Sequence, residues 1–87
     1  MAHHKSARKR IRQSERRRKR NQHIRSGMRT EVKKLRLAIE SGDAGAAAEQ
    51  MKATEKAIRQ AATKGVIPKR RADRAVSRLT KNVNALG

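Results

Sequence analysis

Fifteen arginines and ten lysines are the residues of this sequence whose types and spacing suggest a specific chemistry. Five basic residues run consecutively from Arg16 to Arg20, within the stretch QSERRRKRNQHIRSGMR at 13–29. Guanidinium groups bind phosphate oxygens in a bidentate geometry, and ammonium groups bind them as point charges. These residues therefore indicate binding of a phosphate-bearing polyanion, provided that the fold holds them at its surface.

Length and charge limit what that fold can be. Eighty-seven residues allow one small domain with a thin core. Lys plus Arg number 25 against 7 Asp plus Glu, a formal net charge of +18. Self-repulsion at this level opposes compaction unless a polyanion neutralises it. Nucleic acid is the first candidate partner, and an anionic membrane surface is the second.

Several residue types are missing. Without Cys there are no disulfides and no thiolate zinc site, and without Phe, Tyr or Trp there are no aromatic platforms for base stacking. The longest run of large apolar residues is Val66-Ile67, and the N-terminus MAHHKSARKR lacks the apolar core of a secretory signal. We expect a soluble, intracellular protein.

The sequence gives no support for a catalytic site or a metal site. The acids are scattered, no Gly-rich phosphate loop is present, and no His lies near a Ser and an acid in one predicted helix. If Met1 were removed, the amine of Ala2 together with His4 would have the donors to chelate Cu(II), but RNA contacts from this tail are favoured over a metal role for His3 and His4. We expect no enzyme activity, no cofactor and no metal.

We predict a single domain over residues 1–87. Helix-breaking residues divide it into three helices. ESGDAG at 40–45 predicts a helix stop at Ser41-Gly42 and a new cap at Asp43. TKGVIPK at 63–69 repeats the pattern with Gly65 and Pro68. The sequence predicts a tail over 1–6 and helices over 7–40, 44–63 and 68–86.

Each predicted helix carries an apolar stripe at three- and four-residue steps, and these stripes predict an all-α fold, an antiparallel three-helix bundle. Their members are Ile24, Met28, Val32, Leu35 and Ile39 in the first helix; Ala47, Met51, Thr54, Ile58 and Ala61 in the second; and Ala72, Ala75, Val76, Leu79, Val83 and Leu86 in the third.

The first stripe ends before the N-terminus. Continued backwards from Ile24, it meets Asn21, Arg17, Ser14 and Arg10, and Ile11 lies about 100° off the line. The N-terminal half of the first helix therefore has no core to join. We predict that it extends from the bundle as a basic arm, frayed when free and helical when bound to RNA.

Net charge also differs between the N-terminal arm and the segment that follows it. Residues 1–30 carry a net +11, residues 31–60 a net +1 and residues 61–87 a net +6. A basic run can be a solvated face, a disordered tail or a nuclear localisation signal, but good helix formers without Gly or Pro surround this one. On charge and position we expect phosphate contacts from Arg12, Arg18, Arg20 and Arg25, and from a second face comprising Lys69, Arg70, Arg71, Arg74 and Lys81 with Arg78.

Two separated stretches resemble one family. HKSARKRIRQSERRRKRNQHIRSGMRT at 4–30 and TKGVIPKRRADRAVSRLTKNVNAL at 63–86 are similar to the two signatures of the bacterial small-subunit ribosomal protein family conventionally numbered twenty. The resemblance covers essentially the whole chain. Departures from the family pattern occur at His3 and over Pro68, Lys69 and Arg70.

The resemblance implies a three-helix bundle with an extended first helix. It also implies direct, early binding to the 5′ domain and the long penultimate helix of small-subunit ribosomal RNA, beside other ribosomal components in the cytoplasm. A monomer on RNA is the simplest expectation for the oligomeric state. By matching position it implies RNA contacts from Lys5, Ser6, Arg8, Lys9, Arg10, Arg16, Arg17, Asn21, Lys64, Ser77 and Arg78.

Rival functions are distinguishable by experiment. A non-specific DNA- or RNA-condensing protein would bind duplex DNA at least as well as structured RNA. A membrane-active helix needs a broad apolar face beside its basic one, which the first 23 residues lack. Regulatory binding to an acidic protein is a third alternative, although no partner-specific groove is evident from the sequence. We expect no membrane partner and no small-molecule substrate.

Overall fold

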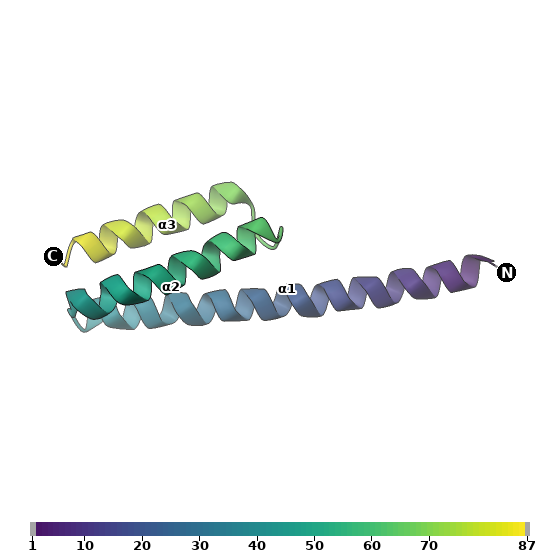
Figure 1. Cartoon of the computed structure of the whole chain (residues 1–87), viewed down its shortest axis with the longest axis horizontal. Helices are drawn as coiled ribbons and strands as arrows, with labels where there is room; N and C mark the ends of the chain where they lie inside the picture. Colours follow the sequence, from purple (N-terminus) through teal and green to yellow (C-terminus); the bar gives the residue numbers. More distant parts are fainter. Residues whose placement is uncertain (1, 87) are drawn as a thin grey trace.

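Three helices joined by short turns make up the chain, as the computed structural model shows for residues 2–86, with side chains described from Lys5 to Leu86 (Figure 1). They are α1 (Ala2–Glu40), α2 (Ala44–Thr63) and α3 (Lys69–Asn84), and no strand occurs within these residues. The predicted all-α three-helix fold is confirmed.

Helix α1 is much longer than the other two. Its 39 residues span about 58 Å at the rise of an α-helix, close to the 65 Å longest dimension of the molecule. The predicted tail over 1–6 is wrong for residues 2–6, because α1 already begins at Ala2. No Gly or Pro interrupts the chain before Gly27, so no helix-breaking residue ends α1 in this segment.

Both turns use a glycine in the left-handed region. Gly42 has φ +75° and Gly65 has φ +76°. The Gly65 amide donates to the Ala62 carbonyl and the Val66 amide donates to the Ala61 carbonyl, at 3.0 and 2.9 Å, which closes α2 in a Schellman motif. Across the first turn, the Asp43 carboxylate accepts the amide of Ala46 at 3.0 Å and caps the start of α2.

Helix α3 is shorter than the predicted range 68–86. Pro68 is its N-cap, with ψ 148°, so the proline precedes the helix rather than forming its first turn. The Pro68 carbonyl still accepts the amides of Arg71 and Ala72. At the other end the Leu86 amide donates to Val83, a tighter turn that ends the regular helix at Asn84.

The core lies between the three predicted stripes. Every predicted member on α2 is buried, and on the other helices Leu35, Ala72, Val76 and Leu79 are buried while the rest pack around them partly exposed. The stripe prediction is confirmed. The turn before α3 adds Val66 and Ile67, each 7% exposed. Helical periodicity does not identify them, since neither lies in a helix.

One polar cluster joins α1 to α2 inside this core. The Thr54 hydroxyl, 0% exposed, donates to the Glu31 carbonyl at 3.0 Å. The Gln50 amide donates to the Glu31 carboxylate at 2.6 Å. Because both donors are satisfied, Thr54 can occupy an apolar stripe without the cost of an unpaired hydroxyl.

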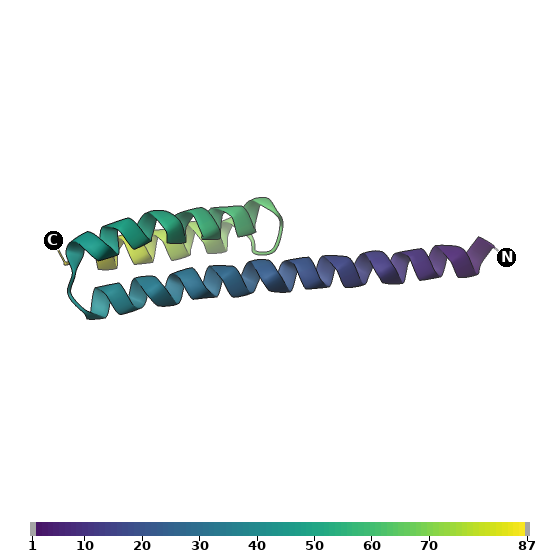
Figure 2. The same ribbon diagram turned by 60° about the horizontal axis from the view of Figure 1, so that its bottom comes forward.

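Helix α2 is the central element of the bundle. Helices α1 and α3 both pack mainly on α2, and they approach each other much less closely. Figure 2 shows α1 passing beneath the α2–α3 pair and continuing far beyond it. The bundle therefore occupies only the C-terminal half of α1.

Candidate nucleic-acid interface

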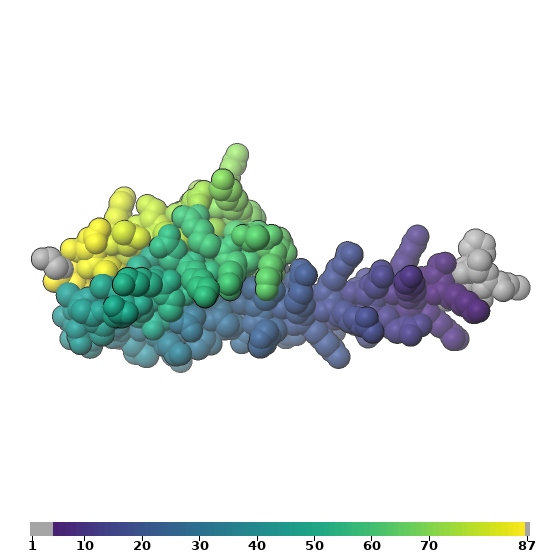
Figure 3. All heavy atoms as spheres, viewed as in Figure 1, coloured from purple at the N-terminus to yellow at the C-terminus, as the bar shows by residue number. Residues whose placement is uncertain are grey.

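The projecting part of α1, residues 2–20, is called the arm below. In Figure 3 it is a thin rod whose side chains stand out on several sides. Every residue from Lys5 to Arg20 is exposed, and even the apolar Ile11 is 59% exposed. The arm thus presents to the outside the predicted contacts Lys5, Ser6, Arg8, Lys9, Arg10, Arg12, Arg16, Arg17, Arg18 and Arg20.

The described cations of the arm form no ion pair with a described carboxylate. Four ion pairs occur among the described side chains, and their cations are Lys34, Lys52 and Arg59. All three belong to residues 31–60, the segment of nearly balanced charge. The predicted phosphate-binding residues form no ion pair within the described part of the chain, so their charge is available to an external anion.

Arg20 marks the point where the arm meets the bundle. Its guanidinium Nη2 donates to the Lys64 carbonyl at 3.3 Å, next to the C-terminal end of α2. A cation at a helix C-terminus is favoured by the helix dipole and by the unpaired carbonyls there. Arg20 and Lys64, both predicted as RNA contacts, are therefore brought together, whereas Asn21 beside them is half-buried.

A basic ridge continues from the arm along the bundle half of α1. Arg18, Arg25 and Arg29 follow one another at seven- and four-residue steps, with Lys33 four residues further on, so they lie on one side of the helix. All four are exposed, and shallow depressions run between them. Arg29 and Lys33 were not among the predicted contacts, although the same spacing would have found them.

The structure also contains a groove between α1 and α3, of about 890 Å³. We call it the arginine groove. Its apolar lining includes Val32 from α1 and Ala75 and Leu79 from α3. The lining also includes the guanidinium-bearing residues Arg36, Arg70, Arg71, Arg74 and Arg78.

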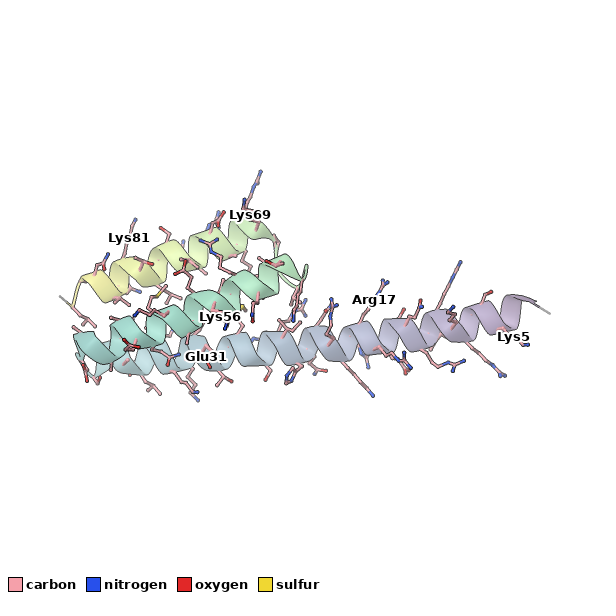
Figure 4. The ribbon with its side chains drawn as sticks, in the orientation of Figure 1. Lys5, Arg17, Glu31, Lys56, Lys69 and Lys81 are labelled. Carbon is pink, nitrogen blue, oxygen red and sulfur yellow. The ribbon has the colours of Figure 1, made fainter. Side chains whose placement is uncertain are left out.

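This groove revises the predicted second basic face. Arg70, Arg71, Arg74 and Arg78 line it, together with Arg36 and Asn82, which were not predicted. Lys69, Ser77 and Lys81 are exposed but do not line it, and Figure 4 shows Lys69 and Lys81 pointing away from α2. Arg36 was missed because it lies in the segment whose net charge is only +1.

The described residues give little support for a metal site or a membrane-spanning helix. Among the described residues no three His, Asp or Glu side chains are grouped so that they could hold a metal ion. The side chains of His3 and His4, weighed above as metal ligands, lie outside the described ones. Across the described residues, none of the helices is long and apolar enough to cross a membrane.

The fold and its surface define a small helical protein whose unpaired charge is displayed on an arm, a ridge and a groove. Comparison with known proteins specifies the family. Residues 2–84 match the family described as Ribosomal protein S20, and the chain belongs to that family.

Similar proteins come from several bacteria, and those named here are called small ribosomal subunit protein bS20. The chain is 55% identical over 87 residues to the protein of Geobacter metallireducens, covering all of both chains. It is 53% identical to that of Trichlorobacter lovleyi over the same full length. The protein of Gluconobacter oxydans is 54% identical over 86 residues, 99% of this chain and 97% of the relative.

Family membership establishes the coarse function. The chain is a structural, non-enzymatic constituent of the small ribosomal subunit, associated with ribosomal RNA and other ribosomal components. The predicted family and the predicted lack of enzyme activity are both confirmed. A ribosomal protein of this family is located in the ribosomes of the cytoplasm.

Proposed function

We propose that the chain binds small-subunit ribosomal RNA directly, through phosphate and shape contacts, and so supports assembly of the subunit. The observation that carries the proposal is the arm: sixteen consecutive exposed residues, Lys5 to Arg20, include ten basic ones and no ion pair among the described side chains. Such a surface has no role within the bundle. Counterion release from RNA would supply the binding free energy.

Shape rather than base sequence is the expected basis of recognition by the arm. A-form RNA has a deep, narrow major groove that hides its base edges, while its phosphates remain accessible. A helix charged on several sides can lie between phosphate backbones and contact more than one. The 5′ domain and the long penultimate helix are the RNA regions implied by the family resemblance, and we propose them as the partners.

The proposal is tested by measuring binding of the purified chain to a 5′-domain ribosomal RNA fragment across a salt series. Unrelated structured RNA of equal length and duplex DNA are the competitors. Eight phosphate contacts predict a log–log salt slope of about −6 to −7. A steep slope with preference for the ribosomal fragment supports the proposal, whereas a steep slope without preference identifies a non-specific condensing protein.

Assembly is tested separately by reconstituting the subunit with the full chain and with a variant lacking residues 2–20. The truncation leaves the buried core residues in place, since all of them lie at or beyond Leu35. We expect the truncated protein to fold and to be depleted from reconstituted particles. Equal incorporation of the two proteins would contradict a role for the arm in assembly.

A further inference from the structure

The arginine groove has a feature that phosphate binding does not use. Its lining is apolar at Val32, Ala75 and Leu79, and Val32 and Ala75 are only half-buried. A paired RNA helix presents phosphates, sugars and shallow base edges at its surface, with its base faces stacked inside. Duplex RNA lying across the groove would contact the arginines but would leave the apolar lining in water, an unfavourable arrangement.

An unpaired nucleobase has the complementary chemistry. It is a flat, largely apolar group carried on an anionic chain, and unpaired bases in loops and bulges stack on aromatic rings or on arginine guanidinium planes. This chain has no Phe, Tyr or Trp. Arginine is therefore its main planar stacking partner, and five of the fifteen arginines surround this one groove.

The charges on α3 also indicate an anionic occupant. Arg70, Arg74 and Arg78 follow one another at four-residue steps, an arrangement of like charges that destabilises a helix. The only acid of α3, Asp73, instead pairs with Arg59 of α2. None of the groove arginines forms an ion pair among the described side chains, so phosphates beside the base would relieve their repulsion.

The groove and the arm can bind the same RNA. Arg25, Arg29 and Lys33 extend the charge of the arm along α1 toward Val32 and Arg36, which line the groove. The groove volume of about 890 Å³ lies within the range of ligand sites in proteins. A strand held by its phosphates on the ridge is thereby positioned to place a base between α1 and α3.

We propose that the arginine groove binds an unpaired base of the RNA held by the arm, with the base against Val32 and Ala75 and its neighbouring phosphates on the α3 arginines. This inference rests on the proposed RNA-binding function and adds a second mode of contact, to a base rather than to a phosphate backbone. Selectivity for an unpaired base, which phosphate contacts of the arm do not provide, would then come from the bundle.

The first experiment compares two short RNA hairpins, one fully paired and one identical except for a single bulged 2-aminopurine. Binding to the full-length protein is measured at several salt concentrations. Stacking of one base on a guanidinium predicts about 2- to 30-fold tighter binding of the bulged hairpin, together with a change in 2-aminopurine fluorescence. Because salt weakens the phosphate contacts of both hairpins and leaves stacking nearly unchanged, the preference is expected to persist as salt rises.

A charge-conserving variant tests the planar contact. In this variant lysine replaces the five groove arginines (Arg36→Lys, Arg70→Lys, Arg71→Lys, Arg74→Lys and Arg78→Lys). The substitutions keep every charge but remove all the guanidinium planes of the groove. Lysine and arginine have similar helix propensities and these sites are exposed, so the bundle should fold, as circular dichroism can check. We expect the ratio of bulged to paired affinity to fall to about one. The contrasting variant carries Arg8→Lys, Arg10→Lys, Arg12→Lys, Arg16→Lys and Arg17→Lys in the arm, and the ratio should survive there.

Crosslinking locates the base independently. A 4-thiouridine placed at the bulge is irradiated in the complex, and the modified peptide is identified by mass spectrometry. Crosslinks on the α3 segment containing Ala75 and Leu79 support the proposal, and crosslinks confined to the arm overturn it.

The remaining outcomes are also decisive. Equal binding of paired and bulged hairpins, or a preference that survives in the lysine groove variant, overturns the base site while leaving RNA binding intact. Failure to bind either hairpin or the ribosomal fragment overturns the proposed function as well. If an acidic amphipathic peptide binds in a manner that the groove variant abolishes and the bulge gives no preference, the groove docks a protein and the proposal is wrong.

Discussion

The two halves of α1 belong to one continuous helix but are stabilised in different ways. From Ile24 to Ile39 the helix places an apolar stripe against α2 and carries an ion pair between Lys34 and Glu31. From Lys5 to Arg20 it buries nothing, and its tertiary hydrogen bond is that of Arg20 at the very end. The same secondary structure therefore serves as core in one half and is an exposed basic surface in the other.

We expect this difference to separate stability from binding along the chain. Mutations in the bundle half should change the free energy of unfolding, and mutations in the arm should change RNA affinity. The sharpest tests of the comparison are substitutions of the same type placed in both regions.

Truncating a core isoleucine should have the largest effect. Ile58 is 1% exposed, and Ile58→Ala should lower the free energy of unfolding by about 3 kcal/mol, through lost apolar burial and the cavity left behind. Ile11→Ala in the arm is the matched control and should change it by less than about 0.5 kcal/mol. Urea denaturation measures both. Similar losses at the two sites would show that the arm packs on the bundle.

Neutralising one face of the arm should have the next largest effect, on binding alone. Arg8→Gln, Arg12→Gln and Arg16→Gln together should weaken RNA binding on the order of 100-fold at moderate salt and reduce the salt slope by about 2 to 3. The unfolding midpoint should not fall, because these side chains contact no other helix.

The matched control for this triple variant removes three charges from the bundle with Lys34→Gln, Lys52→Gln and Lys56→Gln. Net charge falls equally, yet these exposed residues lie outside the arm, the ridge and the arginine groove. We expect the loss in RNA affinity to be much less than one tenth of that caused by the triple variant of the arm. Equal losses for the two triple variants would mean that net charge, rather than the arm, determines binding.

A smaller effect on stability is expected at the turn before α3. Gly65 has φ +76°, and a Cβ there would meet no atom within 4 Å. Gly65→Ala should therefore cost about 1 kcal/mol from backbone strain alone. Thermal unfolding measures the change, with Gly27→Ala as the control: Gly27 is helical, and a Cβ there also meets no atom within 4 Å, so that substitution should stabilise the protein.

The smallest free energy among these predictions is that of local unfolding of the arm. Because nothing packs on it, the arm should open with little cost in free protein and become protected when RNA neutralises its charge. Hydrogen exchange of the full chain should show fast exchange over 5–20, slow exchange over 28–39, and slower arm exchange with RNA. Equal protection of both segments without RNA would contradict the predicted fraying.

Local sequence signals predicted most of the fold. The glycines at 42 and 65, the cap at Asp43 and the three apolar stripes lie where the structure has turns, a cap and a core. Burial of Val66 and Ile67 was not predictable from helical spacing, because these two residues reach the core from a turn. The N-terminal helix boundary was misplaced at residue 7, because no capping or breaking residue marks the start of a helix that begins at Ala2.

Composition and periodicity by themselves determined the class of partner, the number of helices and the position at which α1 leaves the core. These properties depend on residues close together in the chain, where charge density and apolar spacing act directly. Only the tertiary structure decided how α1 and α3 sit around α2. It brought Arg36 and Val32 of α1 into one groove with the arginines of α3, since a groove depends on which helix faces are left uncovered when the core is packed.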